Sequence, residues 1–177
     1  MSDIKTVLDE TPFQTAGPFL HIGCLPNAIN IEGVFDNDLG VKPFANKHND
    51  KFITITGSVF DGDGKALDDI MLESWQSDEN GVYSPECGFA RFVPDSLTKK
   101  FNLYTLKPGF MNNIDGKAQS PHILLSISSR GLNMTLNTRI YFEGDDLTSD
   151  PLLSTVRNSR NDVSSLVAKK IDEDIYL

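Results

Sequence analysis

Residues 120–130 read SPHILLSISSR, and this stretch decides the fold. Ile123, Leu125 and Ile127 alternate with Leu124 and with serines. A period of two is typical of a β-strand that has one strongly apolar face. The stretch therefore predicts a strand that turns one side towards a hydrophobic core.

A second alternating run, residues 134–142, follows after a short join that contains Gly131 and Asn133. Two alternating runs joined by so few residues, with turn-forming side chains between them, predict an antiparallel hairpin. We place this hairpin at the centre of a β-sheet. His122 then lies at the start of its first strand and Arg130 at its turn.

Other strand-like runs are short, and turns rich in Gly, Pro and Asn separate them. Residues 67–76 follow the Asp-Gly-Asp-Gly turn at 61–64 and are expected to return beside residues 51–60. Residues 84–100 are predicted to be irregular. The remaining predictions are a long loop at 27–51, strands at 101–107 and 165–171, and a short helix or loop at 152–161. This pattern favours an all-β fold, a single-domain β-sandwich with long loops.

Length and charge exclude several classes of partner. A chain of 177 residues makes one domain, and its net charge of −9 is unfavourable for nucleic acid or an anionic membrane surface. No run reaches transmembrane length, and the first residues lack the pattern of a signal peptide. Cys24 and Cys87 form neither a metal motif nor a disulfide framework. We expect a cytoplasmic protein with two reduced thiols.

Residues 11–19 contain two prolines, a glycine and two aromatic side chains. This composition excludes a helix and is too apolar for a free tail, so it predicts an extended arm docked on a surface. The surface is either an edge of this chain's own sheet or a partner. We divide the chain into an arm, residues 1–24, and a sandwich, residues 25–177.

Three side chains with different chemistries are candidates for a site near the sheet: Tyr83, His122 and Arg130. Each also has an ordinary structural explanation. The tyrosine could cap a core, the histidine could be a hydrogen-bonded residue at the start of a strand, and the arginine could be solvated. A functional Arg130 would offer a planar fork to a carboxylate. These residues alone leave the function undecided.

Five blocks spread over most of the chain resemble the intradiol ring-cleavage dioxygenases. Within that family they are similar to the α subunits of two-subunit members that act on protocatechuate. The resemblance implies a β-sandwich paired with a β subunit. The blocks are residues 11–23 (TPFQTAGPFLHIG), 73–83 (ESWQSDENGVY), 106–113 (LKPGFMNN), 121–123 (PHI) and 130–142 (RGLNMTLNTRIYF).

The resemblance implies that the β subunit holds a non-haem Fe³⁺ with two tyrosines and two histidines. There, protocatechuate is cleaved with O₂ to 3-carboxy-cis,cis-muconate. In this sequence the first tyrosine position is Tyr83 and the first histidine position is His122. The second histidine position is Leu124, and the second tyrosine position falls at or next to Met111. A thioether suits hard Fe³⁺ poorly, so we expect Tyr83 and His122 to be remnants of a metal site in an iron-free chain without catalytic residues.

The resemblance also implies substrate contacts made by this chain. The arm would reach the β subunit's active site, so Thr15, Gly17 and Pro18 are expected to line that pocket. Arg130 would pair with the substrate carboxylate. The competing hypothesis is a non-enzymatic β-sandwich binding or interaction module derived from the family, whereas a self-sufficient dioxygenase is contradicted by Leu124. Chains of this kind continue beyond residues 168–170 into further strands, so the sandwich could be truncated at its C-terminus.

Overall fold

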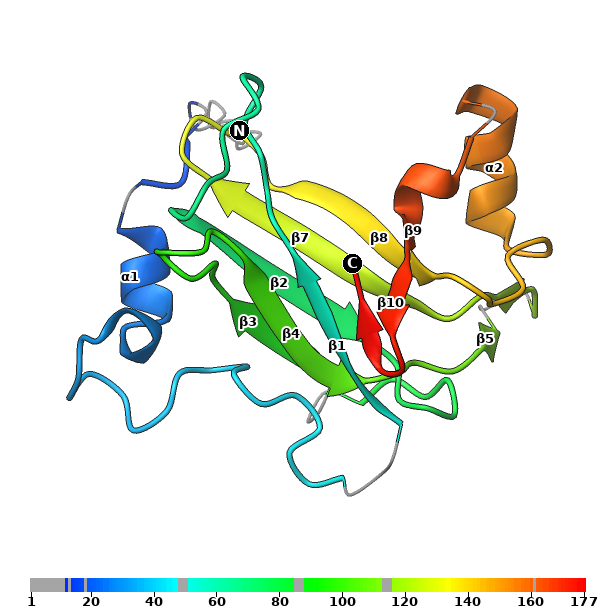
Figure 1. The fold of residues 1–177 in the computed structure, drawn as a ribbon, viewed down its shortest axis with the longest axis horizontal. Coiled ribbons are helices and arrows are strands. Elements are labelled where there is room, and N and C mark those ends of the chain that lie inside the picture. The colour runs from blue at the N-terminus through cyan, green and yellow to red at the C-terminus, as the bar shows by residue number, and fades with distance from the viewer. Residues whose placement is uncertain are drawn as a thin grey trace, which may run out of the picture.

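Two β-sheets packed face to face make up most of the structure (Figure 1). It is a computed structural model that describes residues 12, 14–17, 19–47, 51–84, 88–112, 116–160 and 162–177. One sheet has five strands in the order β3-β2-β7-β8-β9. These strands are β2 (Ile70–Gln76), β3 (Phe89–Phe92), β7 (His122–Ser129), β8 (Leu136–Phe142) and β9 (Val167–Ala168).

The second sheet has four strands in the order β10-β11-β1-β4. They are β1 (Phe52–Gly57), β4 (Phe101–Leu106), β10 (Lys170–Asp172) and β11 (Ile175–Tyr176). A separate two-stranded ribbon joins β5 (Met111–Asn112) to β6 (Ala118–Gln119). The last strands contribute to both large sheets, because β9 pairs in parallel with β8 and β11 pairs in parallel with β1.

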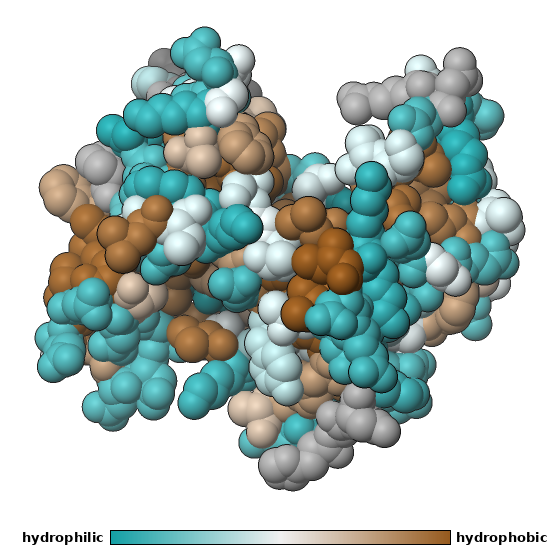
Figure 2. Space-filling view, viewed as in Figure 1, coloured by the Kyte–Doolittle hydropathy of each residue, from teal (hydrophilic) through white to brown (hydrophobic). Residues whose placement is uncertain are grey.

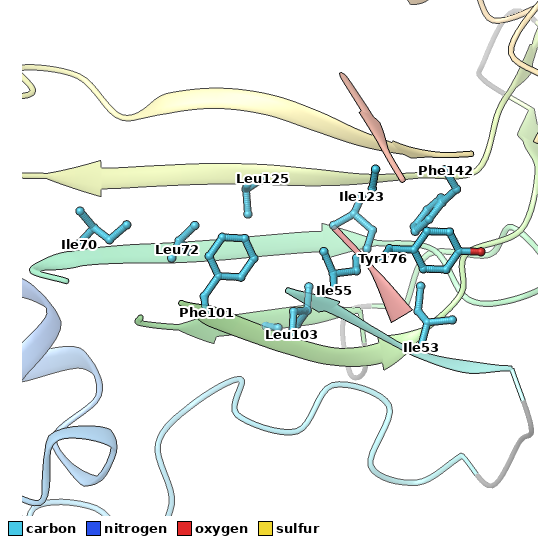
Figure 3. Packing of buried hydrophobic residues seen from close by; sticks show 12 residues of the cluster. Ile53, Ile55, Ile70, Leu72, Phe101, Leu103, Ile123, Leu125, Phe142 and Tyr176 are labelled. Atoms are coloured by element: carbon cyan, nitrogen blue, oxygen red, sulfur yellow. The ribbon is translucent and has the colours of Figure 1, made fainter. Parts of the chain in front are cut away.

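The hydrophobic core lies between the two sheets (Figure 3). Alternate residues of each strand point inward, as the period of two requires. In β1 these are Ile53 and Ile55, and in β7 they are Ile123 and Leu125. The other core residues labelled in Figure 3 are Ile70, Leu72, Phe101, Leu103, Phe142 and Tyr176. The predicted all-β sandwich is therefore confirmed.

The hairpin that decided the fold is present, and it lies inside the five-stranded sheet. Residues of β7 pair in antiparallel register with β8, from His122 opposite Tyr141 to Ile127 opposite Leu136. β7 is the third of five strands, so the prediction that the hairpin lies at the centre of a sheet is confirmed.

Two predictions about strands were wrong. β2 does not return beside β1: after an isolated bridge between Phe60 and Ala66 the chain crosses to the other sheet. There β2 pairs with β3 and β7 and is largely buried. Residues 84–100 are not wholly irregular, because they contain β3, in which only Ala90 is buried and the alternation is correspondingly weak.

Helices are few and short in the described residues. α1 (Leu20–Cys24) forms the end of the segment assigned to the arm, and α2 (Pro151–Arg160) follows β8 where a helix or a loop was expected. Two 3₁₀ turns, η1 (Asn27–Ile29) and η2 (Ser164–Leu166), complete the set. Cys24 is a free thiol, and Cys87 lies outside the described residues.

Lys47 fastens the end of the long loop to a turn that follows β2. Its ammonium donates to Asp78 Oδ2 at 2.8 Å and to Glu79 Oε2 at 2.9 Å. The hydrogen bond from Lys47 lowers the pKa of Glu79. Burial pushes the pKa of Asp78 upward, but hydrogen bonds from Lys47 and from the backbone of Val82 outweigh it, and the net shift is downward.

We expect Lys47→Met to make the protein less sensitive to acid. Carboxyl groups whose pKa is lower in the folded state stabilise it above their unfolded pKa, near 4, and this stabilisation is lost as the pH falls through the folded pKa. The variant should lose at most about 1 kcal/mol of unfolding free energy at pH 7 and match the wild type below about pH 3. Urea unfolding at pH 7, 5 and 3 measures this, with exposed Lys100→Met as the control. A loss that is independent of pH would contradict the prediction.

Candidate functional site

The outer face of the five-stranded sheet gathers the residues predicted to be remnants of a metal site. Trp75 of β2 pairs with Leu124 of β7, which pairs with Arg139 of β8. One step along, His122 pairs with Tyr141. Directly paired residues point to the same side of a sheet. These five side chains therefore form one patch, on the side opposite the core.

Tyr83 is held over this patch by the turn that follows β2. Gly81 in that turn has a positive φ of 77°, and a Cβ there would lie 1.9 Å from the carbonyl oxygen of Phe110. Only glycine allows the turn to pack this closely on the loop that leads to β5. Tyr83 then stacks on Trp75, with ring centroids 5.9 Å apart. Burial raises the pKa of the Tyr83 phenol, which therefore stays protonated at neutral pH.

His122 is buried and has a fixed tautomer. Its Nδ1 lies 2.7 Å from the carbonyl oxygen of Ser120, which can only accept, so Nδ1 carries the proton. Nε2 is left as the nitrogen with a lone pair. Burial lowers the pKa of the imidazole, which is therefore neutral at pH 7. The ring lies 5.7 Å from that of Tyr141.

The other two predicted ligand positions carry no suitable donor. Leu124 is a hydrocarbon, and Met111 offers a thioether in β5, where it pairs with Gln119. One phenol, one imidazole and a thioether supply too few hard donors for a ferric ion. Within the described residues no three His, Cys, Asp or Glu side chains are grouped so that they could hold a metal ion.

Arg139 belongs to this patch on its β8 side, although its place in the sequence had not marked it as a site residue. Its Nη1 donates to Gln119 Oε1 at 3.1 Å and to the Tyr141 hydroxyl at 3.3 Å. Its positive charge also acts on both Tyr83 and His122. The signal was available, because Arg139 alternates with core-facing Ile140 in a run already predicted to pair with β7.

The second group of predicted site residues lies at the opposite end of β7. Arg130 follows the last residue of β7, is 61% exposed and forms an ion pair through Nε with Asp69. Thr15 of the arm donates from Oγ1 to the carbonyl oxygen of Ser129 at 3.5 Å. Gly17 is exposed, with open space where a Cβ would be. Pro18 lies outside the described residues.

The structure therefore brings the candidate residues together in two groups, not one. β7 spans 8 residues, about 24 Å at about 3.4 Å per residue. In Figure 1 the arrowhead of β7 is beside the blue N-terminal segment, and the start of the strand is on the side of α2 and β5. Tyr83 and His122 lie near the start of the strand. Thr15 and Arg130 lie at its end, so Arg130 does not share a site with Tyr83 and His122 in this chain.

The sandwich and its outer-face patch define the class of protein. The sequence profile described as Dioxygenase matches residues 28–173, and the chain belongs to the intradiol dioxygenase family. The similar solved structures have the same fold. Catechol 1,2-dioxygenase from Pseudomonas arvilla C-1 superposes with a TM-score of 0.59 at 19% identity over 73% of this chain, which spans only 46% of that protein. The dioxygenase domain of a dioxygenase–carbohydrate-binding protein fusion from Streptomyces sp. SirexAA-E superposes with a TM-score of 0.55 at 20% identity. The match covers 82% of this chain and 88% of that domain.

Two relatives are similar over nearly the whole chain. The protocatechuate 3,4-dioxygenase alpha chain of Pseudomonas putida is 33% identical over 95% of this chain and 87% of its own length. The protocatechuate 3,4-dioxygenase alpha chain of Burkholderia cepacia is 30% identical over 93% of this chain and 86% of its own length. The predicted family resemblance is therefore confirmed. In the part of the chain that the structure describes, no helix is long and apolar enough to cross a bilayer.

Proposed function

We propose that this chain is the iron-free α subunit of a protocatechuate 3,4-dioxygenase. Its β subunit would hold the Fe³⁺ and cleave protocatechuate with O₂ to 3-carboxy-cis,cis-muconate. This chain would line the β subunit's pocket with Thr15, Gly17 and Pro18 and would orient the substrate with Arg130. The assembled oligomer would be the enzyme, and this chain alone would be inactive.

The separation of the two residue groups carries the proposal. Thr15 and Arg130 lie together at one end of β7, about 24 Å from the patch around His122, at about 3.4 Å per residue. At that distance Thr15 and Arg130 could not bind a substrate held near Tyr83 and His122 of the same chain. They make sense if they serve a site on a second chain.

The chemistry of Arg130 suits a carboxylate. Its ion pair with Asp69 is made through Nε, and the side chain is 61% exposed. A guanidinium presents its donors as a planar fork and can bind two oxygens of a carboxylate at once. Protocatechuate carries one carboxylate that catechol lacks. Arg130 would therefore select and orient the acid without touching the ring that reacts.

A partner subunit would also cover apolar surface next to the arm. Large hydrophobic residues gather over α1 and the loop that follows it, at the left of Figure 2. An apolar surface of this kind on a soluble domain often marks an interface. This surface continues directly from the arm in sequence. Its exposed residues are Phe19, Ile31, Val34, Phe35, Leu39 and Val41.

A visible absorption spectrum tests the proposal. The chain purified alone after growth with iron should be colourless, because ferric–tyrosinate charge transfer needs ligands that it lacks. Co-expression with a homologue that carries two tyrosine and two histidine ligands should give a stable red complex that cleaves protocatechuate. A red chain on its own would refute the iron-free assignment. A colourless chain that forms no complex with such a homologue would favour the non-enzymatic interaction module.

A further inference from the structure

Arg139 is linked, directly or through one or two neighbouring residues, to each position where a ligand was predicted. It pairs directly with Leu124 across β7 and β8. Through Nη1 it reaches Gln119, the partner of Met111, and Tyr141, the neighbour of His122. Tyr83 stacks on Trp75, and Trp75 pairs with Leu124. A single guanidinium thus binds residues that adjoin the former ligand positions His122 and Met111.

We propose that Arg139 takes the place of the metal ion and excludes metal from this chain. This inference rests on the proposed function, in which Tyr83, His122 and Leu124 occupy former ligand positions. The guanidinium supplies a fixed positive charge, and it satisfies the polar groups of Gln119 and Tyr141 that would otherwise need another partner. The loss of iron is then an exchange of one cation for another, and not merely the absence of ligands.

Exclusion of the metal would be electrostatic, because the guanidinium charge of Arg139 acts on both Tyr83 and His122. A cavity of about 480 Å³ borders Leu124 and Arg139 and continues to Leu152 and Val156 of α2. Asp162 lies on its far wall. A divalent or trivalent ion bound by Tyr83 and His122 would experience the same positive charge. Like charges repel strongly in a half-buried site.

The consequence is that restoring a ligand cannot by itself restore metal binding. Leu124→His adds a second imidazole beside His122, two residues along the same face of β7. With Arg139 in place, this variant should bind Zn²⁺ weakly. The double variant Leu124→His with Arg139→Gln keeps a hydrogen-bonding side chain at position 139 but removes its charge. We expect it to bind Zn²⁺ at least about a hundredfold more tightly.

Competition with a chromophoric chelator measures the Zn²⁺ dissociation constants, and circular dichroism checks that each variant folds. The matched control combines Leu124→His with Arg130→Gln. This removes the same charge six residues from position 124, about 20 Å away at about 3.4 Å per residue. That distance is beyond the screening length of physiological salt, so affinity should stay within about twofold.

Equal affinities for the single and the double variant would overturn the role of Arg139. No detectable Zn²⁺ binding by the double variant would overturn the convergence of Tyr83, His122 and residue 124 on one site. Both outcomes are read on the isolated chain. They are distinct from failure of the proposed function, which is read on the wild-type chain with its partner.

Discussion

If this chain works as proposed, Arg130→Ala in its assembly with a β subunit should raise the KM for protocatechuate about ten- to a hundredfold and leave the KM for catechol nearly unchanged. A hydrogen-bonded charge pair contributes about 1.5–3 kcal/mol, and each 1.4 kcal/mol is about a factor of ten. Arg130 is exposed at the end of β7, so its removal leaves no buried group unpaired. Steady-state kinetics with both substrates, each at saturating O₂, measure the effect.

Asp69→Ala is the matched control for Arg130. Asp69 forms an ion pair with Arg130 in this chain. If the only role of Arg130 were its ion pair with Asp69, Arg130→Ala and Asp69→Ala would lower activity to the same extent. If Arg130 binds the carboxylate, Asp69→Ala frees the guanidinium and should leave the KM for protocatechuate unchanged or lower. Equal losses for protocatechuate and catechol in Arg130→Ala would refute the role in substrate binding.

Asp150→Ala should be strongly destabilising. Asp150 is fully buried, and its Oδ1 accepts the backbone N–H groups of Leu152 and Leu153 at the start of α2. Its Oδ2 accepts the N–H of Ser120, which precedes β7. The loss of a helix cap costs about 1 kcal/mol, and each buried donor left without an acceptor costs about 1–3 kcal/mol. We expect a loss of about 3 kcal/mol, or a fall in Tm of about 6–12 °C.

Differential scanning calorimetry measures the loss, and Asp95→Ala is its control. Asp95 likewise accepts two backbone N–H groups, from Leu97 and Thr98, but in an exposed turn where water can replace it. The control should therefore lower Tm far less. Asp150→Asn, which keeps one oxygen acceptor, should fall between the two. Similar losses for Asp150→Ala and Asp95→Ala would show that burial at position 150 is not the cause.

Strong alternation made the central hairpin predictable, because the apolar face of β7 has no other interpretation. The pairing of β2 was not predictable in the same way. A turn followed by a strand implies neighbours in about two-thirds of cases, and here the chain changes sheet after the bridge at Phe60. β3 has only four residues and one buried side chain, Ala90, so its sequence shows no detectable alternation of apolar and polar residues.

The candidate site was predicted in part. His122 and Leu124 share a face because they are two residues apart in one strand. The positions of Tyr83 and Met111 depend on the close contact of two loops at Gly81, which no periodicity reveals. Arg139 and Asp150 were missed because their partners, Gln119 and Ser120, lie on segments whose placement follows from the whole fold. The separation of Arg130 from His122 follows from strand length, once their strand is known.

The C-terminal strands have a consequence for synthesis. β11 pairs in parallel with β1, and β9 pairs in parallel with β8, so both sheets are completed only after residues 167–176 have been synthesised. Contacts between residues so distant in sequence form late and slowly. Until β9 and β11 have left the ribosome, the edges of β1 and β8 lack these neighbours and are open to pairing with another chain. Synthesis alongside a partner subunit would therefore protect this protein before β9 and β11 form.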